Sequence, residues 1–245
     1  MGPKRTYHRF AYKGANFRIG CPLAERVEEE IVRQRELLEA YIARHAEFAT
    51  ALAPLAAAPD APEVARRMAR AAEAVGVGPM AAVAGTMAQL AAEAAIARGA
   101  DEAVVENGGD LYLLCRRPIV VGLYAGDSPL SDRLALKIEP GDTPRAICSS
   151  SGTMGHSLSL GRCDLATVTA RDASLADAAA TLAANLVRAP ADIDSALERI
   201  AGIEGVDGVL LVQGDRLGIA GRPGELVANR DPELTLKVTK DPDAE

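Results

Sequence analysis

Residues 80–99, MAAVAGTMAQLAAEAAIARG, are small and apolar almost throughout. A helix at the surface of a protein usually carries a broad polar face, and this stretch has almost none. The sequence therefore predicts a helix that is buried on most sides, which several other elements must cover. Gly99 is a natural stop for this helix, because glycine is favoured just after the last helical turn.

The segments before this helix predict a hairpin and two more helices. Residues 7–12 and 16–20 alternate as short strands do. Apolar residues then recur with a period near 3.6 over 23–52, which predicts a long amphipathic helix that begins after Pro22. A proline-containing linker, 53–62, precedes a helix at about 63–75. With no Trp and three Phe, the core must be built from Ala, Leu, Val and Ile.

From residue 103 the pattern changes to strands. We expect strands at 103–107, 111–115, 118–124, 134–138, 165–170, within 206–221 and at 234–238, and helices at about 173–188 and 191–200. Neither a repeat nor a clear boundary divides the chain. The prediction is a single α+β domain over residues 1–245, in which a mixed or antiparallel sheet packs with helices. The N-terminal hairpin and long helix occupy about 7–52, and an acidic tail at about 240–245 is expected to be disordered.

Charge and cysteine content restrict the class of function. A net charge of −7 argues against nucleic-acid binding, which needs a dense basic face. The four cysteines are scattered and form no CxxC pair, which indicates reduced, buried thiols. Neither a signal peptide nor an uncharged apolar stretch of about 18 residues is present. We therefore expect a soluble, cytoplasmic protein that binds neither nucleic acid nor membrane.

The first candidate site is Asn107-Gly108-Gly109-Asp110, between two predicted strands. Paired glycines permit positive φ and the close approach of another backbone or of a ligand. Asn and Asp favour turns by bonding nearby backbone groups. These residues alone fit a tight hairpin turn as well as they fit a binding loop.

The second candidate site follows the strand at 165–170. Asp177 and Thr181 lie four residues apart, on one face of the predicted helix. A carboxylate and a hydroxyl at this spacing offer two hard oxygen atoms to a divalent cation such as Mg²⁺. The alternative is that Asp177 only complements the dipole at the helix N-terminus.

The third candidate site is SSSGTMGHSLSLG, residues 149–161. Hydroxyl residues and glycines suit a loop whose backbone N–H groups receive phosphate. The loop also contains His156, one of three histidines in the chain. A Ser/Gly loop without any ligand would have the same composition.

The order of these motifs resembles the ApbE family of flavin transferases. The run AVVENGGDLYL resembles the NxGGD strand–turn–strand of that family, and LATVTARDASLADAAATLA resembles its strand-then-helix segment. SSSG followed by His156 resembles its TSG segment and later histidine, and VAGTMAQLAAEAA its glycine-containing helix. The resemblance covers about residues 80–190.

The resemblance implies a fold, cofactors and a reaction. Members of the family bind FAD, use Mg²⁺, and typically transfer FMN from FAD to a Thr or Ser of an acceptor protein, whereas others only bind or hydrolyse FAD. It also implies the site residues. The metal ligands would be Asp177, Thr181 and a backbone carbonyl near Gly85. The flavin nucleotide, FAD or FMN, would contact Asn107, Gly108, Gly109, Asp110, Ser150, Ser151, Gly152 and Thr153. The base would be His156 or Asp110, with Asp164 as a further candidate.

Two departures from the family pattern leave the function open. The family usually has Lys-Gly in the helix and an Asp a few residues on, where this chain has Ala84-Gly85-Thr86 and then Gln89. The segment after TSG is shortened and lacks its Asp. The alternatives are an accessory protein that binds a nucleotide or anion without turnover, for example in sulfur or amino-acid metabolism, and an interaction protein that uses the helix at 23–52. A homodimer is also open.

Overall fold

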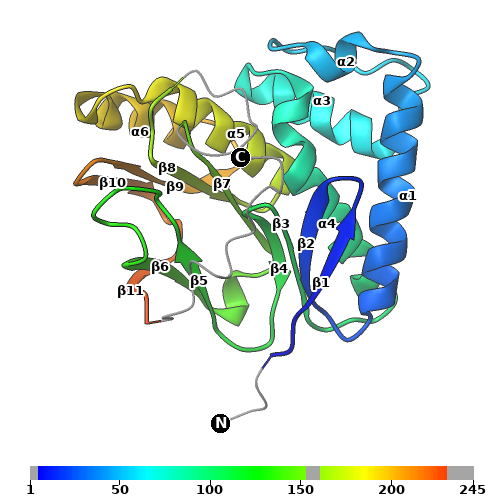
Figure 1. The fold of residues 1–245 in the computed structure, drawn as a ribbon, viewed down its shortest axis with the longest axis horizontal. Helices are drawn as coiled ribbons and strands as arrows, with labels where there is room; N and C mark the ends of the chain where they lie inside the picture. Colours follow the sequence, from blue (N-terminus) through cyan, green and yellow to red (C-terminus); the bar gives the residue numbers. More distant parts are fainter. Residues whose placement is uncertain (1–4, 153–160, 231–245) are drawn as a thin grey trace.

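Two antiparallel sheets and one layer of helices make up the structure, a computed structural model that describes residues 5–152 and 161–230 (Figure 1). The large sheet has eight strands, and the small sheet has three. In spatial order the large sheet holds β1 (His8–Tyr12), β2 (Ala15–Gly20), β3 (Ala103–Asn107), β4 (Asp110–Leu114), β7 (Arg145–Ser150), β8 (Leu165–Ala170), β9 (Val206–Gln213) and β10 (Arg216–Gly221). The small sheet holds β11 (Glu225–Ala228), β6 (Leu134–Ile138) and β5 (Ile119–Leu123). This arrangement confirms the α+β prediction.

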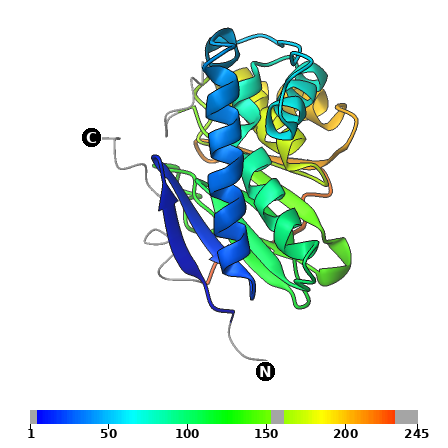
Figure 2. The same cartoon turned by 90° about the vertical axis from the view of Figure 1, so that its right-hand side faces the viewer.

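The helices cover one face of the large sheet, and the small sheet packs against the other. The helices are α1 (Ala24–Ile42), α2 (Glu47–Thr50), α3 (Glu63–Val75), α4 (Val83–Ile96), α5 (Ala173–Leu186) and α6 (Ile193–Ala201), with 3₁₀ turns η1 (Pro79–Ala82), η2 (Pro140–Asp142) and η3 (Pro190–Asp192). Helix α4 contacts α1, α3, α5, β3 and β4, and Figure 2 shows α1 running along its outer side. The prediction of a helix buried on most sides is confirmed, because every residue from Gly85 to Ala92 is buried.

Strand alternation separates two cores and decides which side chains can meet. In β4, Leu111 and Leu113 face the small sheet, whereas Tyr112 faces the helices. Asp110 has the same parity as Tyr112 and therefore points into the helix layer. In β7, Cys148 joins the core on the helix side, and Ile147 joins the core on the other side. Asp110 of the first motif thus faces the helix layer, in which the second motif, Asp177 and Thr181, lies.

The prediction of one long helix over 23–52 is wrong in its second half. Helix α1 ends at Ile42, and the chain turns before the short helix α2. The turn lets Phe48 fold back until its ring meets that of Tyr41 edge-on, 5.1 Å between centroids, and Phe48 is 0% exposed. A straight helix would have carried this phenylalanine past the core, so burial of the ring outweighs helix continuity.

Several other boundaries differ from those expected. Residues 145–150 form the strand β7, which was not expected and which takes in the first two residues of the loop predicted at 149–161, because its backbone pairs with both β4 and β8. The helix expected from residue 80 begins as the 3₁₀ turn η1, and β11 was not expected. The strand expected at 234–238 and the acidic tail at about 240–245 lie outside the described residues.

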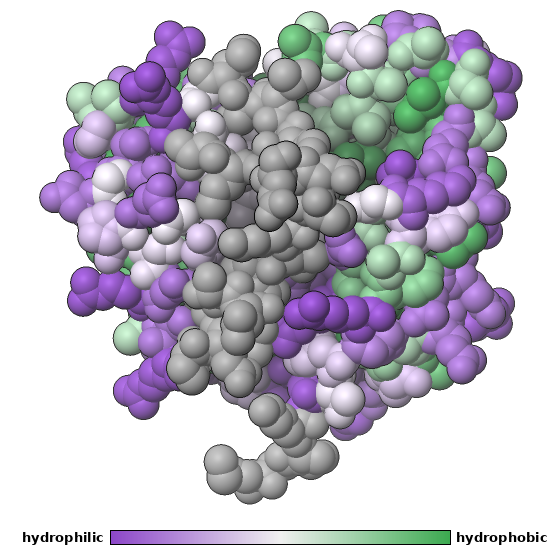
Figure 3. Space-filling view, viewed as in Figure 1, coloured by the Kyte–Doolittle hydropathy of each residue, from purple (hydrophilic) through white to green (hydrophobic). Residues whose placement is uncertain are grey.

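Among the described residues, no single helix is long and apolar enough to cross a membrane, and the two apolar helical segments 63–75 and 79–96 are bent by 106° relative to each other. Figure 3 shows apolar residues at the upper right, where Figure 1 places α2 and α3. The most exposed large apolar residue there is Leu52. All four cysteines are free thiols, and three of them are buried.

Candidate functional site

The candidate site lies where the N-termini of α4 and α5 meet the β3–β4 turn and the end of β7. Five described residues that the sequence singled out are buried here or contact one another across these elements: Gly85, Asn107, Asp110, Asp177 and Thr181. They come from parts of the chain about 90 residues apart. The fold therefore brings together the first two motifs, which the sequence could only place in order.

The β3–β4 turn is a two-residue hairpin loop that also contacts a helix. Asn107 and Asp110 are paired across it. Gly108 and Gly109 both have positive φ, +62° and +104°, which glycine adopts without strain. The Asn107 side-chain amide donates to the carbonyl of Ala84 at 3.3 Å. The hairpin prediction is confirmed, and its first residue fixes the turn to the start of α4.

Asp177 lies at the crossing of α4 and α5. Its Oδ2 accepts a hydrogen bond from the Gly85 N–H at 2.8 Å, and the Ala84 N–H also stabilises the carboxylate. Burial nevertheless raises the pKa of Asp177 to about 7, because the charged form loses its hydration. The resemblance implied a backbone carbonyl ligand in this segment, whereas the group of Gly85 that faces Asp177 is its N–H.

Asp110 is a second buried carboxylate beside Asp177. Burial raises its pKa well above the usual range, and the neighbouring charge of Asp177 raises it further. The Ser149 N–H, which donates to Oδ1 at 3.2 Å, and the Cys148 thiol act in the opposite direction. The groups that favour the charged forms of these two carboxyl groups are neutral hydrogen-bond donors. Such a pair favours the uptake of a proton or of a cation.

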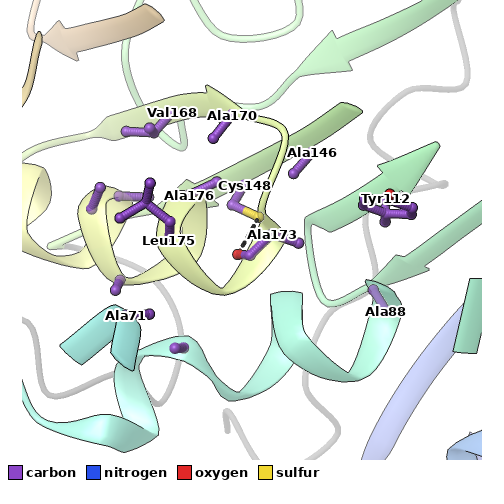
Figure 4. Packing of buried hydrophobic residues seen from close by; sticks show 14 of the residues in the cluster. Ala71, Ala88, Tyr112, Ala146, Cys148, Val168, Ala170, Ala173, Leu175 and Ala176 are labelled. Atoms are coloured by element: carbon purple, nitrogen blue, oxygen red, sulfur yellow. Dashed lines mark hydrogen bonds between the residues drawn. The ribbon is translucent and has the colours of Figure 1, made fainter. Parts of the chain in front are cut away.

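Cys148 is a member of this cluster that the sequence analysis did not single out. Its thiol donates to the carbonyl of Ala173, with 3.6 Å between sulfur and oxygen (Figure 4). Burial raises the pKa of the thiol well above its usual range, and both aspartates add to the shift. A lone cysteine within a strand gives no signal of such surroundings, since its neighbours come from β4 and α5.

The third motif contributes the end of β7. The buried hydroxyl oxygen of Ser150 has no hydrogen-bond partner among the described residues. The Ser151 hydroxyl and the Gly152 N–H both reach the carbonyl of Cys163, at 3.3 Å and 2.8 Å. Thr153 and His156 lie outside the described residues.

Polar residues of α4 form a further part of the site, whose contacts the sequence analysis did not predict. The Gln89 carbonyl oxygen accepts the Ala173 N–H at 2.7 Å, and the Thr86 and Ser174 hydroxyls hydrogen-bond at 2.8 Å. Thr86, Gln89 and Glu93 are rare polar residues in an apolar helix, spaced by three or four. Their spacing places them along one helical stripe, which was the available signal.

The side chains of the site that could bind a cation offer hard oxygen atoms. Among residues 5–152 and 161–230, no group of three or more His, Cys, Asp or Glu side chains could hold a metal ion. A cation at this site would need a mixed set of carboxylate, hydroxyl and backbone oxygens. Mg²⁺ accepts such a set, because it usually keeps several waters and uses few protein carboxylates.

Sequence relatives cover most of the chain. The UPF0280 protein of Methanocella arvoryzae is 45% identical over 213 residues, which is 86% of this chain and 85% of that protein. The UPF0280 protein MK0206 of Methanopyrus kandleri is 45% identical over 202 residues, 80% of this chain and 81% of that protein.

Solved structures share the fold. A flavin transferase ApbE variant from Vibrio cholerae matches with a TM-score of 0.55 at 14% identity, covering 97% of this chain and 100% of that one. The flavinyl transferase ApbE of Pseudomonas stutzeri matches with a TM-score of 0.52 at 14% identity, covering 90% and 95%. A family model described as "AbpE bacteria" matches residues 9–208. The chain therefore belongs to the AbpE bacteria family and has the fold of the ApbE flavin transferases.

Proposed function

We propose that this protein binds a flavin nucleotide together with Mg²⁺ at the candidate site, and that the bond it acts on is the pyrophosphate of FAD. One observation carries the proposal: the buried carboxylate of Asp177 lies at the meeting of two helix N-termini, beside the second buried carboxylate of Asp110. The relation to flavin transferases supplies the class of ligand.

The residues present fit such a ligand. Two buried carboxylates are better accommodated when a cation neutralises them, since an unpaired buried charge is costly. The unpartnered hydroxyl of Ser150 offers a donor to a phosphate oxygen. Asp177 and Thr181 would hold the ion, with a backbone carbonyl near Gly85. When bound, Mg²⁺ would neutralise charge on the phosphates and polarise them toward attack.

The remaining residues bind the nucleotide and handle the proton. The Asn107–Asp110 turn and residues 150–152 would flank the nucleotide. The hydroxyl of a Ser or Thr on an acceptor protein, or a water molecule, would attack the phosphorus atom on the FMN side. A new P–O bond forms, the P–O bond to AMP breaks, and AMP leaves. Asp110, whose pKa is raised by burial, would accept the proton of the incoming hydroxyl, and His156 is the alternative base.

The test is incubation of the full chain with FAD and Mg²⁺, followed by chromatography for FMN and AMP. We expect both products in stoichiometric amounts with water as acceptor, and loss of turnover in Asp177→Ala. Asp127→Ala is the matched control, because Asp127 is an exposed carboxylate on the connection between β5 and β6. Equal turnover by wild type and Asp177→Ala would exclude the proposed role of Asp177.

A second candidate function is binding of the flavin nucleotide without turnover. The observation that favours it is Gln89, which stands where the resemblance leads one to expect an acid and whose amide is engaged by Ala173 and Glu93. A yellow protein that retains intact FAD through purification and releases neither FMN nor AMP would identify this function.

A further inference from the structure

The side chain of Gln89 connects three helices. Its carbonyl oxygen accepts the N–H of Ala173 on α5 at 2.7 Å. Its amide nitrogen donates to Oε1 of Glu93 at 2.8 Å, one turn further along α4. Glu93 Oε2 in turn pairs with Arg67 of α3 at 2.9 Å. Both ends of the buried amide are therefore engaged, which fixes the amide in one orientation.

The bond from Gln89 completes the N-terminus of α5. The first N–H groups of a helix have no partner within it. The side chain of Asp172 accepts the N–H groups of Ser174 and Leu175, at 2.8 Å and 3.3 Å. The N–H of Ala173 is the remaining donor of this turn, and Gln89 is its partner. This bond is made by another helix, so it links the start of α5 to α4.

The position of Asp177 depends on this link, because Asp177 lies one helical turn after Ala173 in α5. Hydrogen bonds join α4 to α5 between Gly85 and Asp177, between Thr86 and Ser174, and between Gln89 and Ala173. The Gln89 bond lies one turn of α4 beyond Gly85 and holds the first N–H of α5. With Gln89 replaced, the bonds of Gly85 and Thr86 would remain, but the register of α5 on α4 would lose the constraint at the second turn of α4.

We propose that Gln89 is a positioning residue, which sets the register of α5 on α4 and thereby places the carboxylate of Asp177 for a divalent cation. This role rests on the proposed function, since it concerns the same cation site. Partners of metal ligands contribute to affinity because they hold the ligand in its binding orientation.

The test measures Mn²⁺ binding to the full chain by electron paramagnetic resonance, with Mn²⁺ as the probe for a hard-oxygen site. In Gln89→Met, which keeps the chain length but removes both polar atoms, we expect the Kd for Mn²⁺ to rise about 10- to 100-fold. Gln89→Glu keeps an acceptor for Ala173 but loses the donor to Glu93 and places a second carboxylate beside it, so it should recover only part of the affinity. Gln34→Met is the matched control, because Gln34 is a buried glutamine of α1 whose amide oxygen has no partner among the described residues.

A second measurement needs no metal. Amide hydrogen exchange of Ala173 should become faster in Gln89→Met than in the wild type, and it should be unchanged in Gln34→Met. If Gln89→Met does not fold, Gln89→Asn replaces it, because the shorter amide cannot span the same 2.7 Å contact.

The outcomes separate the two proposals. Mn²⁺ binding that is lost in Asp177→Ala but unchanged in Gln89→Met would overturn the role of Gln89 alone. Unchanged exchange of the Ala173 amide in Gln89→Met would overturn it as well. Absence of Mn²⁺ binding in the wild type, or equal binding in Asp177→Ala, would overturn the cation site and with it any role for Gln89 there.

Discussion

The backbone N–H of Gly85 lies 2.8 Å from Oδ2 of Asp177, where helix α4 crosses α5. The crossing is close because residue 85 has no side chain. A Cβ atom at this position would lie 2.4 Å from the carbonyl oxygen of Ala173 and 2.9 Å from Cβ of Asp177. Glycine thus allows the Asp177 carboxylate of α5 to contact the first turn of α4.

Gly85→Ala should therefore destabilise the protein and weaken cation binding. Alanine gains about 1 kcal/mol in helix propensity over glycine, but overpacking of a tight contact costs about 1–3 kcal/mol. The cost of overpacking should exceed the gain in helix propensity, because the new Cβ clashes with backbone atoms and the two helices must separate. We expect a net loss of up to about 2 kcal/mol in the free energy of unfolding, measured by urea denaturation.

Gly141→Ala is the control for this substitution. Gly141 lies in the turn η2, and no atom lies within 4 Å of a Cβ placed there. Its effect should stay within about 0.5 kcal/mol. If Gly85→Ala were as stable as Gly141→Ala and bound Mn²⁺ normally, the close crossing of α4 and α5 would not hold.

The stability of the metal-free protein should depend on the ionisation of Asp177. Its folded-state pKa of about 7 lies above the ordinary value of 3.8, so the folded state binds the proton more tightly than the unfolded state does. The stabilisation is fully present below pH 3.8 and is lost as the pH rises to about 7. For one carboxyl group the slope reaches at most about 1.4 kcal/mol per pH unit.

Urea unfolding in the presence of EDTA, from pH 4 to about pH 8, measures this dependence. Asp177→Asn should make the profile less steep, because the amide has no proton to lose in this range and the contribution of the neighbouring Asp110 remains. Adding Mg²⁺ at about pH 8 should restore stability to the wild type and leave Asp177→Asn unaffected. A profile that is identical in wild type and variant would contradict the buried, protonated state of Asp177.

Thiol reactivity should report the burial of the cluster. Cys21 is partly exposed, whereas Cys115, Cys148 and Cys163 are buried. Burial raises the pKa of Cys163 to about 12 and that of Cys148 well above its usual range, so neither forms a reactive thiolate near neutral pH. With a thiol-specific chromophoric reagent, we expect one fast-reacting thiol in the native protein and four after denaturation.

Cys21→Ser should abolish the fast phase and leave three thiols that react only after unfolding. Rapid labelling of Cys148 in that variant, identified by peptide mass spectrometry, would show that the interior between β7 and α5 is open to solvent. That result would disagree with the packing in Figure 4.

Much of the fold followed from periodicity, and its errors have physical causes. The apolar segment 80–99 indicated a central helix, and the change to short apolar runs between glycines and prolines from 103 marked the start of the strands. The break in the helix after Ile42 could not be foreseen, because residues 43–46 contain neither Pro nor Gly. It depends on a tertiary contact, the burial of Phe48 against Tyr41.

The sequence predicted the motifs that form the site but not the contacts between them. Asn107, Asp110, Asp177 and Gly85 were singled out by local residue type and by resemblance, and the fold brings them together. Cys148 was not singled out, and Gln89 was noted only as a departure from the family pattern, because their contacts form only when β7 and α4 pack on α5. Sequence spacing shows which face of an element a residue occupies but not which element covers that face.

The most direct test of the account is a calorimetric titration of the full chain with FAD, in Mg²⁺ and in EDTA. The account predicts binding in Mg²⁺ that weakens at least about 10-fold in EDTA and in Asp177→Ala, while Asp127→Ala binds as the wild type does. Absence of FAD binding in Mg²⁺, or FAD binding of equal affinity under all these conditions, would contradict a flavin-nucleotide site built on Asp177.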